Sequence, residues 1–405
     1  MPIFKEIPPT SGWKFCAKDL FLRPATASLE EDFKNYLGVN DVFITYSGTA
    51  ALYLIFESLR RISSKKTVII PAYVCPLVAL AAQKAGLRIK VCDINKDNFD
   101  FNYNNLRDLC LADTDVLAIV AVHLGGIALD FDKIKEIANQ REIFVIEDCA
   151  HALGAAYKGK KCGTLGDFSF FSLCRGKGIT IYEGGVLAVN KKEYSSVVAN
   201  TIKDIARKNY ISEVFKIAEL IGYWIFYRPL LFWFVFKLPQ IFWNLGKNTD
   251  KAFGEEYDTN FDVHAVSVLR KYLGHKSFYR LENEISRQRE RALFYIKALK
   301  EIKGISAVQE NPNAYATYPF LTVLFDETAK RNEFFKKINN YGLGVSIVYL
   351  NAICDYTYLK DNMSCGECSN ARDFSKRQLT LSTSVFLKDK DAEFIIHSLR
   401  ETLSK

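Results

Sequence analysis

The sequence predicts an α/β protein with a mainly parallel central sheet covered by helices, followed by a smaller C-terminal α+β domain. A chain of 405 residues with 49% hydrophobic and 25% charged residues can bury a large core and form two domains. Residues 41–190 alternate short apolar runs, rich in Val and Ile, with helical patterns. Such runs are typical of parallel strands buried on both faces. We therefore expect a large domain over residues 1–255 and a small domain over residues 256–405.

The individual elements follow from these patterns. In the large domain we expect strands at 41–46, 67–72, 88–94, 116–124, 144–150, 168–173 and 184–190, with helices at 49–62, 74–85, 104–110 and 131–141 between them. In the small domain we expect one long amphipathic helix over 265–300, strands at 318–325, 345–350 and 378–385, and helices at 333–342 and 390–403.

Charge and cysteine content narrow the class of protein. The net charge is +8, but the basic residues are dispersed and no aromatic-basic RNA-binding signature is present, so no nucleic-acid partner is expected. The N-terminus lacks a signal pattern and the ten cysteines are scattered, which favours a reduced, cytoplasmic setting. Cys365 and Cys368 form one CxxC motif with Cys354 nearby, and two loop thiols are the simplest interpretation; metal or redox use is the alternative.

Residues 214–245 form an unusual aromatic-rich stretch. It contains three of the four tryptophans, and its longest apolar run, residues 230–236, is bounded by Arg228-Pro229 and Lys237. A spanning helix needs about 20 apolar residues, so this is not a simple transmembrane segment. Two interpretations stay open: contact with a membrane interface, which would place the protein on the inner face of the membrane, or a helical hairpin packed on the domain or at a dimer contact.

Polar residues gather at the carboxyl ends of the predicted strands, where parallel sheets bind ligands. Ser47, His123, Asp148 and Ser172 all occupy such places. Their position at these strand ends makes the four residues candidates for ligand binding.

Lys177 lies between Gly176 and Gly178 in a loop after such a strand. A lysine amine can form a Schiff base when it is unprotonated, and burial near a cation such as Arg175 lowers its pKa. The two glycines would let the backbone approach a flat cofactor closely.

An acid and an anion cradle accompany this lysine. Asp148 ends an apolar strand, and a buried carboxylate there needs a partner such as a pyridinium N–H. Glu147, the preceding residue, should face the opposite side of the sheet. Ser47-Gly48-Thr49 opens a helix whose N-terminus suits a phosphate, with Ser172 as another donor, while His151 is placed to bond a phenolic oxygen. An amine, an acid and a phosphate cradle are what pyridoxal phosphate requires.

These motifs resemble the DegT/DnrJ/EryC1/StrS family, the pyridoxal-phosphate sugar aminotransferases of fold type I. The resemblance covers nearly the whole chain and is most specific over residues 145–185, VIEDCAHALGAAYKGKKCGTLGDFSFFSLCRGKGITIYEGG. SGTAAL at 47–52, VHLGGIALDFDKI at 122–134 and LTLSTSVFLKDKDAEFI at 379–395 are similar to further family segments.

The resemblance implies a role for each matching residue. Lys177 falls at the lysine that holds the cofactor, Asp148 at the partner of the pyridine nitrogen and His151 at the residue beside the ring oxygen. Gly48, Thr49 and Ser172 fall at phosphate contacts. Family members are typically homodimers in which an asparagine of one subunit reaches the phosphate of the other, and Asn260 is the candidate here.

The chain departs from the family pattern at two places. Cys75 stands where the family usually has an aromatic that stacks on the cofactor ring, so either Tyr73 or another residue substitutes or the stacking contact is absent. The aromatic stretch at 214–245 is longer and more apolar than the usual connection.

The resemblance implies an aminotransferase that moves an amino group from glutamate to a nucleotide-linked keto-sugar, for polysaccharide or secondary-metabolite biosynthesis. One alternative is a pyridoxal- or pyridoxamine-phosphate sugar dehydratase, but dehydratases of the family often replace the lysine, so Lys177 favours transamination. The other is a non-catalytic regulatory or scaffold protein on the same fold. The complete set of Lys177, Asp148 and the SGT turn argues against it.

Overall fold

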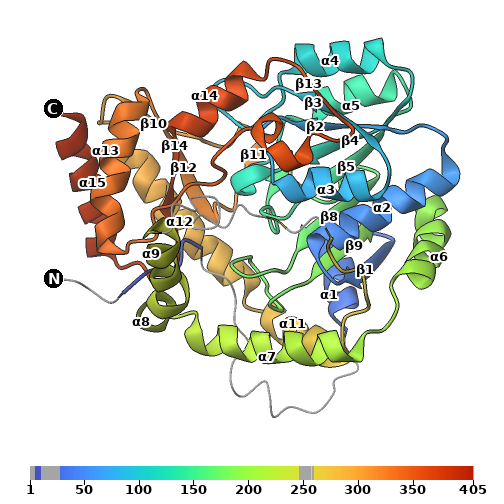
Figure 1. The fold of residues 1–405 in the computed structure, drawn as a ribbon, viewed down its shortest axis with the longest axis horizontal. Helices are drawn as coiled ribbons and strands as arrows, with labels where there is room; N and C mark the ends of the chain where they lie inside the picture. Colours follow the sequence, from blue (N-terminus) through green and yellow to red (C-terminus); the bar gives the residue numbers. More distant parts are fainter. Residues whose placement is uncertain (1–4, 11–27, 246–256, 258–259, 405) are drawn as a thin grey trace.

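The structure, a computed structural model, describes residues 5–10, 28–245, 257 and 260–404. Its centre is an eight-stranded sheet with the order β1-β9-β8-β5-β4-β2-β3-β13 (Figure 1). The strands are β1 (Asp41–Thr45), β2 (Thr67–Pro71), β3 (Arg88–Cys92), β4 (Val116–Val122), β5 (Phe144–Asp148), β8 (Phe168–Ser172), β9 (Gly185–Val189) and β13 (Met363–Cys365). All pairs from β8 to β13 are parallel, and only β9 runs antiparallel to its neighbours β1 and β8. The predicted, mainly parallel sheet is confirmed.

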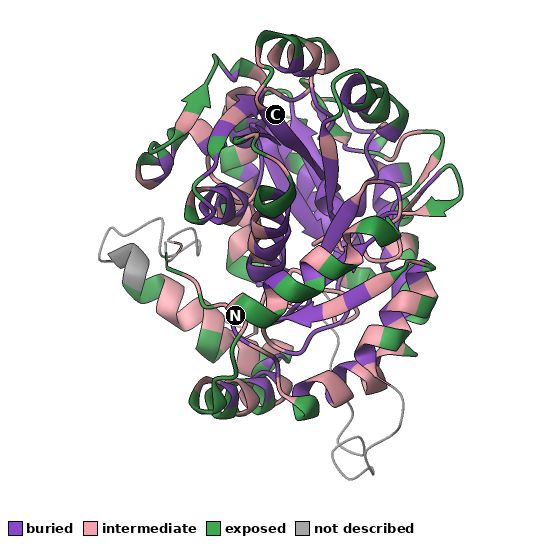
Figure 2. Cartoon of the chain, turned by 90° about the vertical axis from the view of Figure 1, so that its right-hand side faces the viewer, coloured by how far each residue is buried: buried purple, intermediate pink, exposed green. Residues whose placement is uncertain are grey.

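Helices cover both faces of this sheet. Successive strand residues enter two different apolar clusters, Ile70 and Ile146 in one and Ile69 and Val145 in the other. This alternation is the period of two that a strand imposes on its side chains. The buried strands lie between partly exposed helices (Figure 2). The covering helices are α1 (Leu29–Leu37), α2 (Gly48–Ile62), α3 (Pro76–Lys84), α4 (Tyr103–Ala112), α5 (Phe131–Asn139) and α6 (Ser195–Ile205).

The C-terminal part of the chain forms a three-stranded antiparallel sheet with the order β10-β12-β14 and packs helices against it (Figure 1). Its elements are α11 (Val268–Phe278), α12 (Leu281–Leu299), β10 (Ile305–Ala307), β12 (Phe320–Phe325), α13 (Thr328–Ile338), α14 (Ser369–Arg377), β14 (Gln378–Ser382) and α15 (Asp389–Leu403). A further small sheet joins β6 (Ala156–Tyr157), β7 (Lys160–Lys161) and β11 (Ala314–Tyr315). Strand β13 comes from this part of the chain but pairs with β3, so the C-terminal part supplies the edge strand of the large sheet.

Two predicted elements are wrong. The long helix expected over 265–300 is two helices, α11 and α12, which separate at Tyr279 and Arg280. The break lets them pack against different partners, because Gly274 of α11 lies against Leu29 and Ile181 while α12 contacts β10, β12 and α15.

The strand expected at 345–350 is also absent from the described structure, apart from a single bridge between Ser346 and Thr380. The Tyr73 hydroxyl bonds both the N–H and the C=O of Tyr349, at 3.1 and 2.9 Å. The Tyr349 carbonyl also accepts from the Gln378 side chain at 3.2 Å, so side chains rather than a neighbouring strand bond the backbone of Tyr349.

The aromatic stretch forms a chain of helices along one side of the molecule (Figure 1). These are α7 (Tyr210–Phe226), α8 (Pro229–Phe232), a π-helical turn (Trp233–Lys237) and α9 (Leu238–Leu245). No helix within the described residues is both long enough and apolar enough to cross a membrane.

Candidate active site

The Lys177 loop connects β8 to β9 and is closed at its base by backbone hydrogen bonds. The N–H of Leu173 donates to the carbonyl of Gly184 at 2.8 Å, and the N–H of Ile181 donates to Leu173 at 3.1 Å. Lys177 is half-buried, and burial lowers the pKa of its amine despite the opposing influence of Cys174, Cys75 and Asp148. A lower pKa increases the fraction of neutral amine, the form that reacts with an aldehyde.

The two glycines beside Lys177 are not equivalent. Gly176 has φ = +76°, and a Cβ at this position would approach the Thr10 hydroxyl within 2.5 Å. A Cβ at Gly178 would make only ordinary contacts, of 3.6 Å to Leu281 and 3.9 Å to Leu153. Only Gly176 is therefore required by the conformation of the loop.

Asp148 ends β5 close to this amine. Its side chain is 5% exposed and accepts a hydrogen bond from the N–H of Ala150 at 2.9 Å. Burial raises the pKa of Asp148 to about 6, although that hydrogen bond and the charges of Lys177 and His123 oppose the shift. A buried carboxylate of this kind is stabilised by a positive N–H donor, and a protonated pyridine nitrogen is such a donor.

His151 lies three residues further along the chain. Its ring packs edge-to-face against Phe320, with ring centroids 5.2 Å apart. Burial, helped by the positive charge of Lys177, lowers the pKa of His151 well below its usual value. A neutral imidazole can still donate one hydrogen bond, which fits a contact to a ring oxygen.

The phosphate turn is built by close packing. Ser47 caps α2, because its hydroxyl accepts from the N–H of Ala50 at 3.0 Å. A Cβ at Gly48 would lie 3.3 Å from the Cβ of Ser172, and one at Gly185 would overlap the carbonyl of Ser47. The helix N-terminus, with Gly48 and Thr49 in its first turn, is thereby held against Ser172. Its dipole and free N–H groups suit a phosphate.

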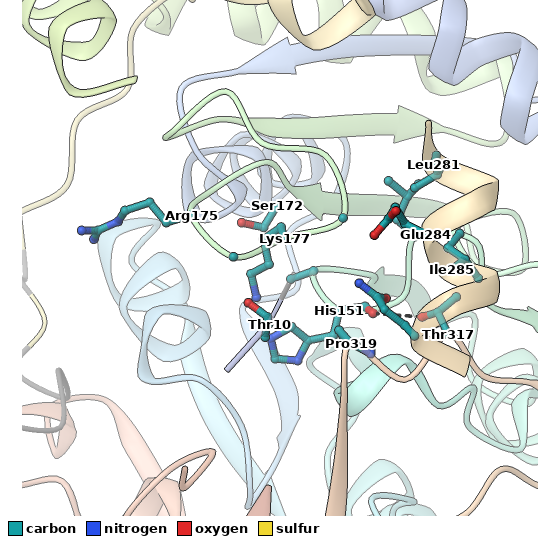
Figure 3. A pocket seen from close by; sticks show the side chains of 15 residues that line it. Thr10, His151, Ser172, Arg175, Lys177, Leu281, Glu284, Ile285, Thr317 and Pro319 are labelled. Carbon is teal, nitrogen blue, oxygen red and sulfur yellow. Dashed lines mark hydrogen bonds between the residues drawn. The ribbon is translucent and has the colours of Figure 1, made fainter. Parts of the chain in front are cut away.

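Three of the predicted site residues, His151, Ser172 and Lys177, line one cavity of about 110 Å³ (Figure 3). Asp148 does not line it, but its N–H partner Ala150 does, and the charge of Lys177 opposes the rise in the pKa of Asp148. Asn260 is elsewhere in the subunit, where its side-chain oxygen accepts from the Lys84 amine at 3.5 Å beside the end of α3. Its contact with the phosphate of a second subunit stays a prediction.

Cys75 is the N-cap of α3, and its thiol is one of the groups that oppose the lowering of the Lys177 pKa. Burial raises the pKa of the Cys75 thiol to about 11. Tyr73 does not take the place of the missing aromatic, because its hydroxyl bonds Tyr349 and its ring packs against Phe374 at 5.0 Å. Tyr349 packs against Tyr73, with ring centroids 5.6 Å apart, and comes from a segment expected to be a strand.

Two residues of α12 also line the cavity and were missed by the sequence analysis, Glu284 and Gln288. A signal was present: both polar residues lie on the otherwise apolar, buried stripe of an amphipathic helix. Helix α7 and the residue after it contact two residues of the lining: the Tyr223 hydroxyl accepts from the N–H of Gly176 at 3.4 Å, and the Tyr227 hydroxyl donates to the carbonyl of Thr10 at 2.7 Å.

A second polar cluster lies deeper, around Glu147. The N–H groups of Gly163, Leu165 and Gly166 donate to its carboxylate at 2.6–2.7 Å, and His123 Nε2 bonds it at 3.1 Å. Because His123 Nδ1 accepts from the N–H of Leu129, Nε2 carries the proton. His123, Glu147 and Cys149 are close enough to bind a metal, but these hydrogen bonds already occupy the His and Glu ligand atoms. The role of this cluster is structural.

The CxxC motif also differs from its simplest interpretation. Cys365 forms a disulfide with Cys354, and the Cys368 sulfur lies 3.4 Å from that of Cys354. The expectation of two loop thiols is therefore wrong for Cys365. Cys354 lies eleven residues before Cys365, and the two meet only because the chain between them folds back, which the CxxC spacing did not predict.

Comparison with known proteins decides the family. The sequence model of the DegT/DnrJ/EryC1/StrS aminotransferase family matches residues 17–223 and 243–400. The chain belongs to this family. The match omits residues 224–242, which lie inside the aromatic stretch, so the family pattern does not cover the centre of this segment.

Relatives and solved structures agree with this assignment. A UDP-4-amino-4,6-dideoxy-N-acetyl-β-L-altrosamine transaminase of Campylobacter jejuni is 27% identical over 93% of this chain and 89% of its own length. The aminotransferase TlmJ from Streptoalloteichus hindustanus has a similar fold, with a TM-score of 0.76, 20% identity and coverage of 98% and 99% of the two chains. A GDP-4-keto-6-deoxy-D-mannose-3-dehydratase of E. coli with bound hydrated PLP also has this fold, with a TM-score of 0.70, 18% identity and coverage of 92% and 90%. The fold alone does not distinguish the two reactions.

Proposed function

We propose that this chain is a pyridoxal-phosphate-dependent aminotransferase that moves an amino group from glutamate to a keto-sugar. The observation that carries the proposal is Lys177, a half-buried lysine with a lowered pKa in the cavity that His151 and Ser172 also line. The second charged group is Asp148, whose negative charge opposes the lowering of the Lys177 pKa. These residues fit the cofactor, because the site has an amine, a buried carboxylate and a helix N-terminus in one place.

When bound, pyridoxal phosphate supplies an aldehyde that captures amines and a ring that accepts electrons. Lys177 would hold it and, once free, move the proton between the substrate carbon and the cofactor carbon. Asp148 would hold the proton on the ring nitrogen, and neutral His151 would donate to the ring oxygen. Gly48, Thr49 and Ser172 would bind the phosphate, next to the N-terminus of α2.

The substrate class is supported by the relatives. The Campylobacter jejuni relative is named for transamination of a UDP-linked amino-dideoxy sugar, and a GDP-perosamine synthase of E. coli O157:H7 is 37% identical over 36% of this chain and 39% of its own length. We therefore propose a nucleotide-linked keto-deoxyhexose as the acceptor, in polysaccharide or secondary-metabolite biosynthesis.

A sugar dehydratase is the less well supported alternative. The fold is shared with one such enzyme, but the family's dehydratases often lack the lysine that this chain retains at 177. A non-catalytic scaffold would not require a lysine and an aspartate to be buried together, because burial of both groups costs stability without a ligand.

Absorption spectroscopy tests the function directly. Purified protein with added pyridoxal phosphate should show a visible band that glutamate bleaches and that the correct keto-sugar restores. A panel of amino sugars, used as donors in the reverse direction, would identify the sugar. A protein that stays colourless with added cofactor would refute the enzyme assignment.

We further propose a homodimer in which Asn260 of one subunit reaches the phosphate held by the other. Mixing Lys177→Ala and Asn260→Ala proteins tests this arrangement. If sites are shared, the mixed dimers contain one site that retains both residues, and activity should reappear on mixing. Two inactive variants that stay inactive after subunit exchange, or a monomer in light scattering, would contradict it.

The outer face of α7 motivates a membrane proposal. Ile211, Val214, Phe215, Ile221 and Ile225 recur at helical spacing on its exposed side, with exposed fractions of 40–74%. The exposed residues Arg207 and Lys208 precede the helix. On its inner side, the Tyr223 hydroxyl contacts the Lys177 loop. An apolar helix face beside cations is typical of interfacial binding to anionic lipids. We propose that the enzyme works in the cytoplasm at the inner face of the membrane.

Vesicle co-sedimentation tests this contact. At low salt the protein should bind vesicles that contain anionic lipid, and Phe215→Glu should weaken the binding. Leu111→Glu, at an exposed leucine of α4, is the matched control and should have no effect. Equal behaviour of the two variants, or no binding by the native protein, would refute the membrane proposal.

A further inference from the structure

Two polar side chains interrupt the buried stripe of α12 where it lines the cavity. Glu284 is 3% exposed and Gln288 is 5% exposed, and both line the same cavity as Lys177. Their spacing of four residues places them one helical turn apart on the same face. Their neighbours on this stripe, Leu281 and Ile285, are apolar.

The carboxylate of Glu284 is incompletely bonded. One oxygen accepts from the Arg287 guanidinium at 3.4 Å, and the other, Oε2, is buried without a hydrogen-bond partner in the described part of the chain. Burial raises the pKa of Glu284, with Arg287 opposing the shift. A buried oxygen without a donor costs about 1–3 kcal/mol, so the fold alone does not explain its retention.

Glu284 points from α12 into the cavity, across from Lys177 and His151 (Figure 3). A carboxylate in that position disfavours phosphate and carboxylate groups, and it favours neutral groups that donate hydrogen bonds. The exposed Arg175 is also among the lining residues, but its guanidinium points away from Lys177 and Glu284 and lies over the Tyr182 ring at 5.3 Å (Figure 3).

The size of the cavity limits what part of a substrate can reach this wall. Its volume of about 110 Å³ is smaller than the roughly 300–1,000 Å³ of pockets that enclose a drug-sized ligand. The cofactor that Lys177 is proposed to hold would share this space, so only part of a nucleotide-linked sugar would lie against Glu284. A sugar ring presents hydroxyl and amide N–H donors, whereas the nucleotide presents a diphosphate that this wall would repel.

We propose that Glu284, with Gln288 beside it, is the wall that binds the hydroxyl or amide donors of the sugar ring. The proposal rests on the sugar aminotransferase function proposed above. It assigns Glu284 to sugar binding and not to the reaction of the amino-acid donor, which needs no sugar contact.

Separate half-reactions test this role. The holoenzyme variants Glu284→Leu and Glu284→Gln are compared with Glu290→Leu, an exposed control on the same helix. The probes are glutamate and two amino sugars, UDP-4-amino-4,6-dideoxy-N-acetyl-β-L-altrosamine and GDP-perosamine. For the amino sugar that reacts, Glu284→Leu should raise KM about 10-fold to 100-fold, the range of a hydrogen bond to a charged group. Glu284→Gln should recover part of this loss, whereas the glutamate half-reaction should not slow, because removal of a carboxylate does not weaken the binding of an anionic donor.

A second readout separates binding from a structural role. If Oε2 awaits a ligand, cofactor-free Glu284→Leu protein should unfold at an equal or higher temperature than the native protein, because an unsatisfied buried group is removed. An unchanged sugar KM, or equal losses in both half-reactions with a lower unfolding temperature, would overturn the inference. If neither amino sugar reacts with native protein that glutamate does bleach, the proposed sugars are wrong and this inference fails with them.

Discussion

Two neighbouring carboxylates on β5, Glu147 and Asp148, lie in opposite environments. Glu147 accepts three backbone hydrogen bonds and one from His123, and its side chain is fully buried. Asp148, at the end of the strand and 5% exposed, accepts one backbone hydrogen bond, and burial raises its pKa to about 6. Hydrogen bonds from the chain fill the acceptor sites of Glu147, whereas the Asp148 carboxylate keeps unused acceptor sites.

This difference in hydrogen bonding distinguishes a structural carboxylate from one that can bind a ligand. A buried carboxylate whose acceptor sites are filled by the chain stabilises a turn, here residues 163–166, and requires no ligand. A buried carboxylate with unused acceptor capacity is costly until a ligand supplies donors. Glu284 repeats the pattern of Asp148 on a different element. The predictions below test this distinction, beginning with the largest effect.

The largest effect should follow loss of Glu147. Glu147→Leu leaves three backbone N–H groups and His123 without their acceptor, so the free energy of unfolding should fall by about 3–5 kcal/mol. Urea denaturation measures the loss, with Glu290→Leu as an exposed control. A loss below about 1 kcal/mol would show that this cluster is not the structural anchor described here.

Asp148→Asn should have the opposite effect on stability. The pKa of Asp148 in the folded, cofactor-free protein is about 6, above the ordinary value of 3.8, so the folded state binds more protons between these values. Stability of this form should therefore fall as pH rises from about 4 to 6. Asparagine removes this dependence and should stabilise cofactor-free protein at pH 7 by up to about 3 kcal/mol, with no gain at pH 4.

The same substitution should damage the reaction. Asparagine cannot hold the ring-nitrogen proton by charge, so the glutamate half-reaction should slow by at least about 100-fold. Thermal unfolding across pH 4–8 and the bleaching rate together check the prediction. A variant that is both less stable at pH 7 and fully active would place Asp148 with Glu147 as a structural group.

A smaller effect should distinguish the glycines beside Lys177. Gly176→Ala must hold a Cβ at φ = +76° against Thr10 and should lose about 1–2 kcal/mol of stability, whereas Gly178→Ala has room and should lose less than about 0.5 kcal/mol. Chemical denaturation of both variants measures the difference. Equal losses would show that the loop does not depend on the left-handed conformation of Gly176.

The sequence predicted what local patterns determine. Alternating apolar runs predicted the sheet, and the motifs around Lys177 predicted three of the residues that line one cavity, His151, Ser172 and Lys177. Prediction failed where distant contacts decide: α11 and α12 separate because they pack on different partners, and Tyr349 leaves the strand pattern because Tyr73 binds its backbone. Glu284 is 107 positions beyond Lys177, and no motif connects them. The role predicted for Asn260 requires a second subunit, which one chain does not contain.

The central claim is that Lys177 holds the cofactor. Borohydride reduction of the native protein with pyridoxal phosphate makes the lysine–cofactor link permanent, and peptide mass spectrometry then locates it. The account predicts the modification on the peptide that contains Lys177, at close to one per chain, and its loss after treatment with glutamate before reduction. Modification of another lysine, or none above the level seen with Lys177→Ala, would contradict the account.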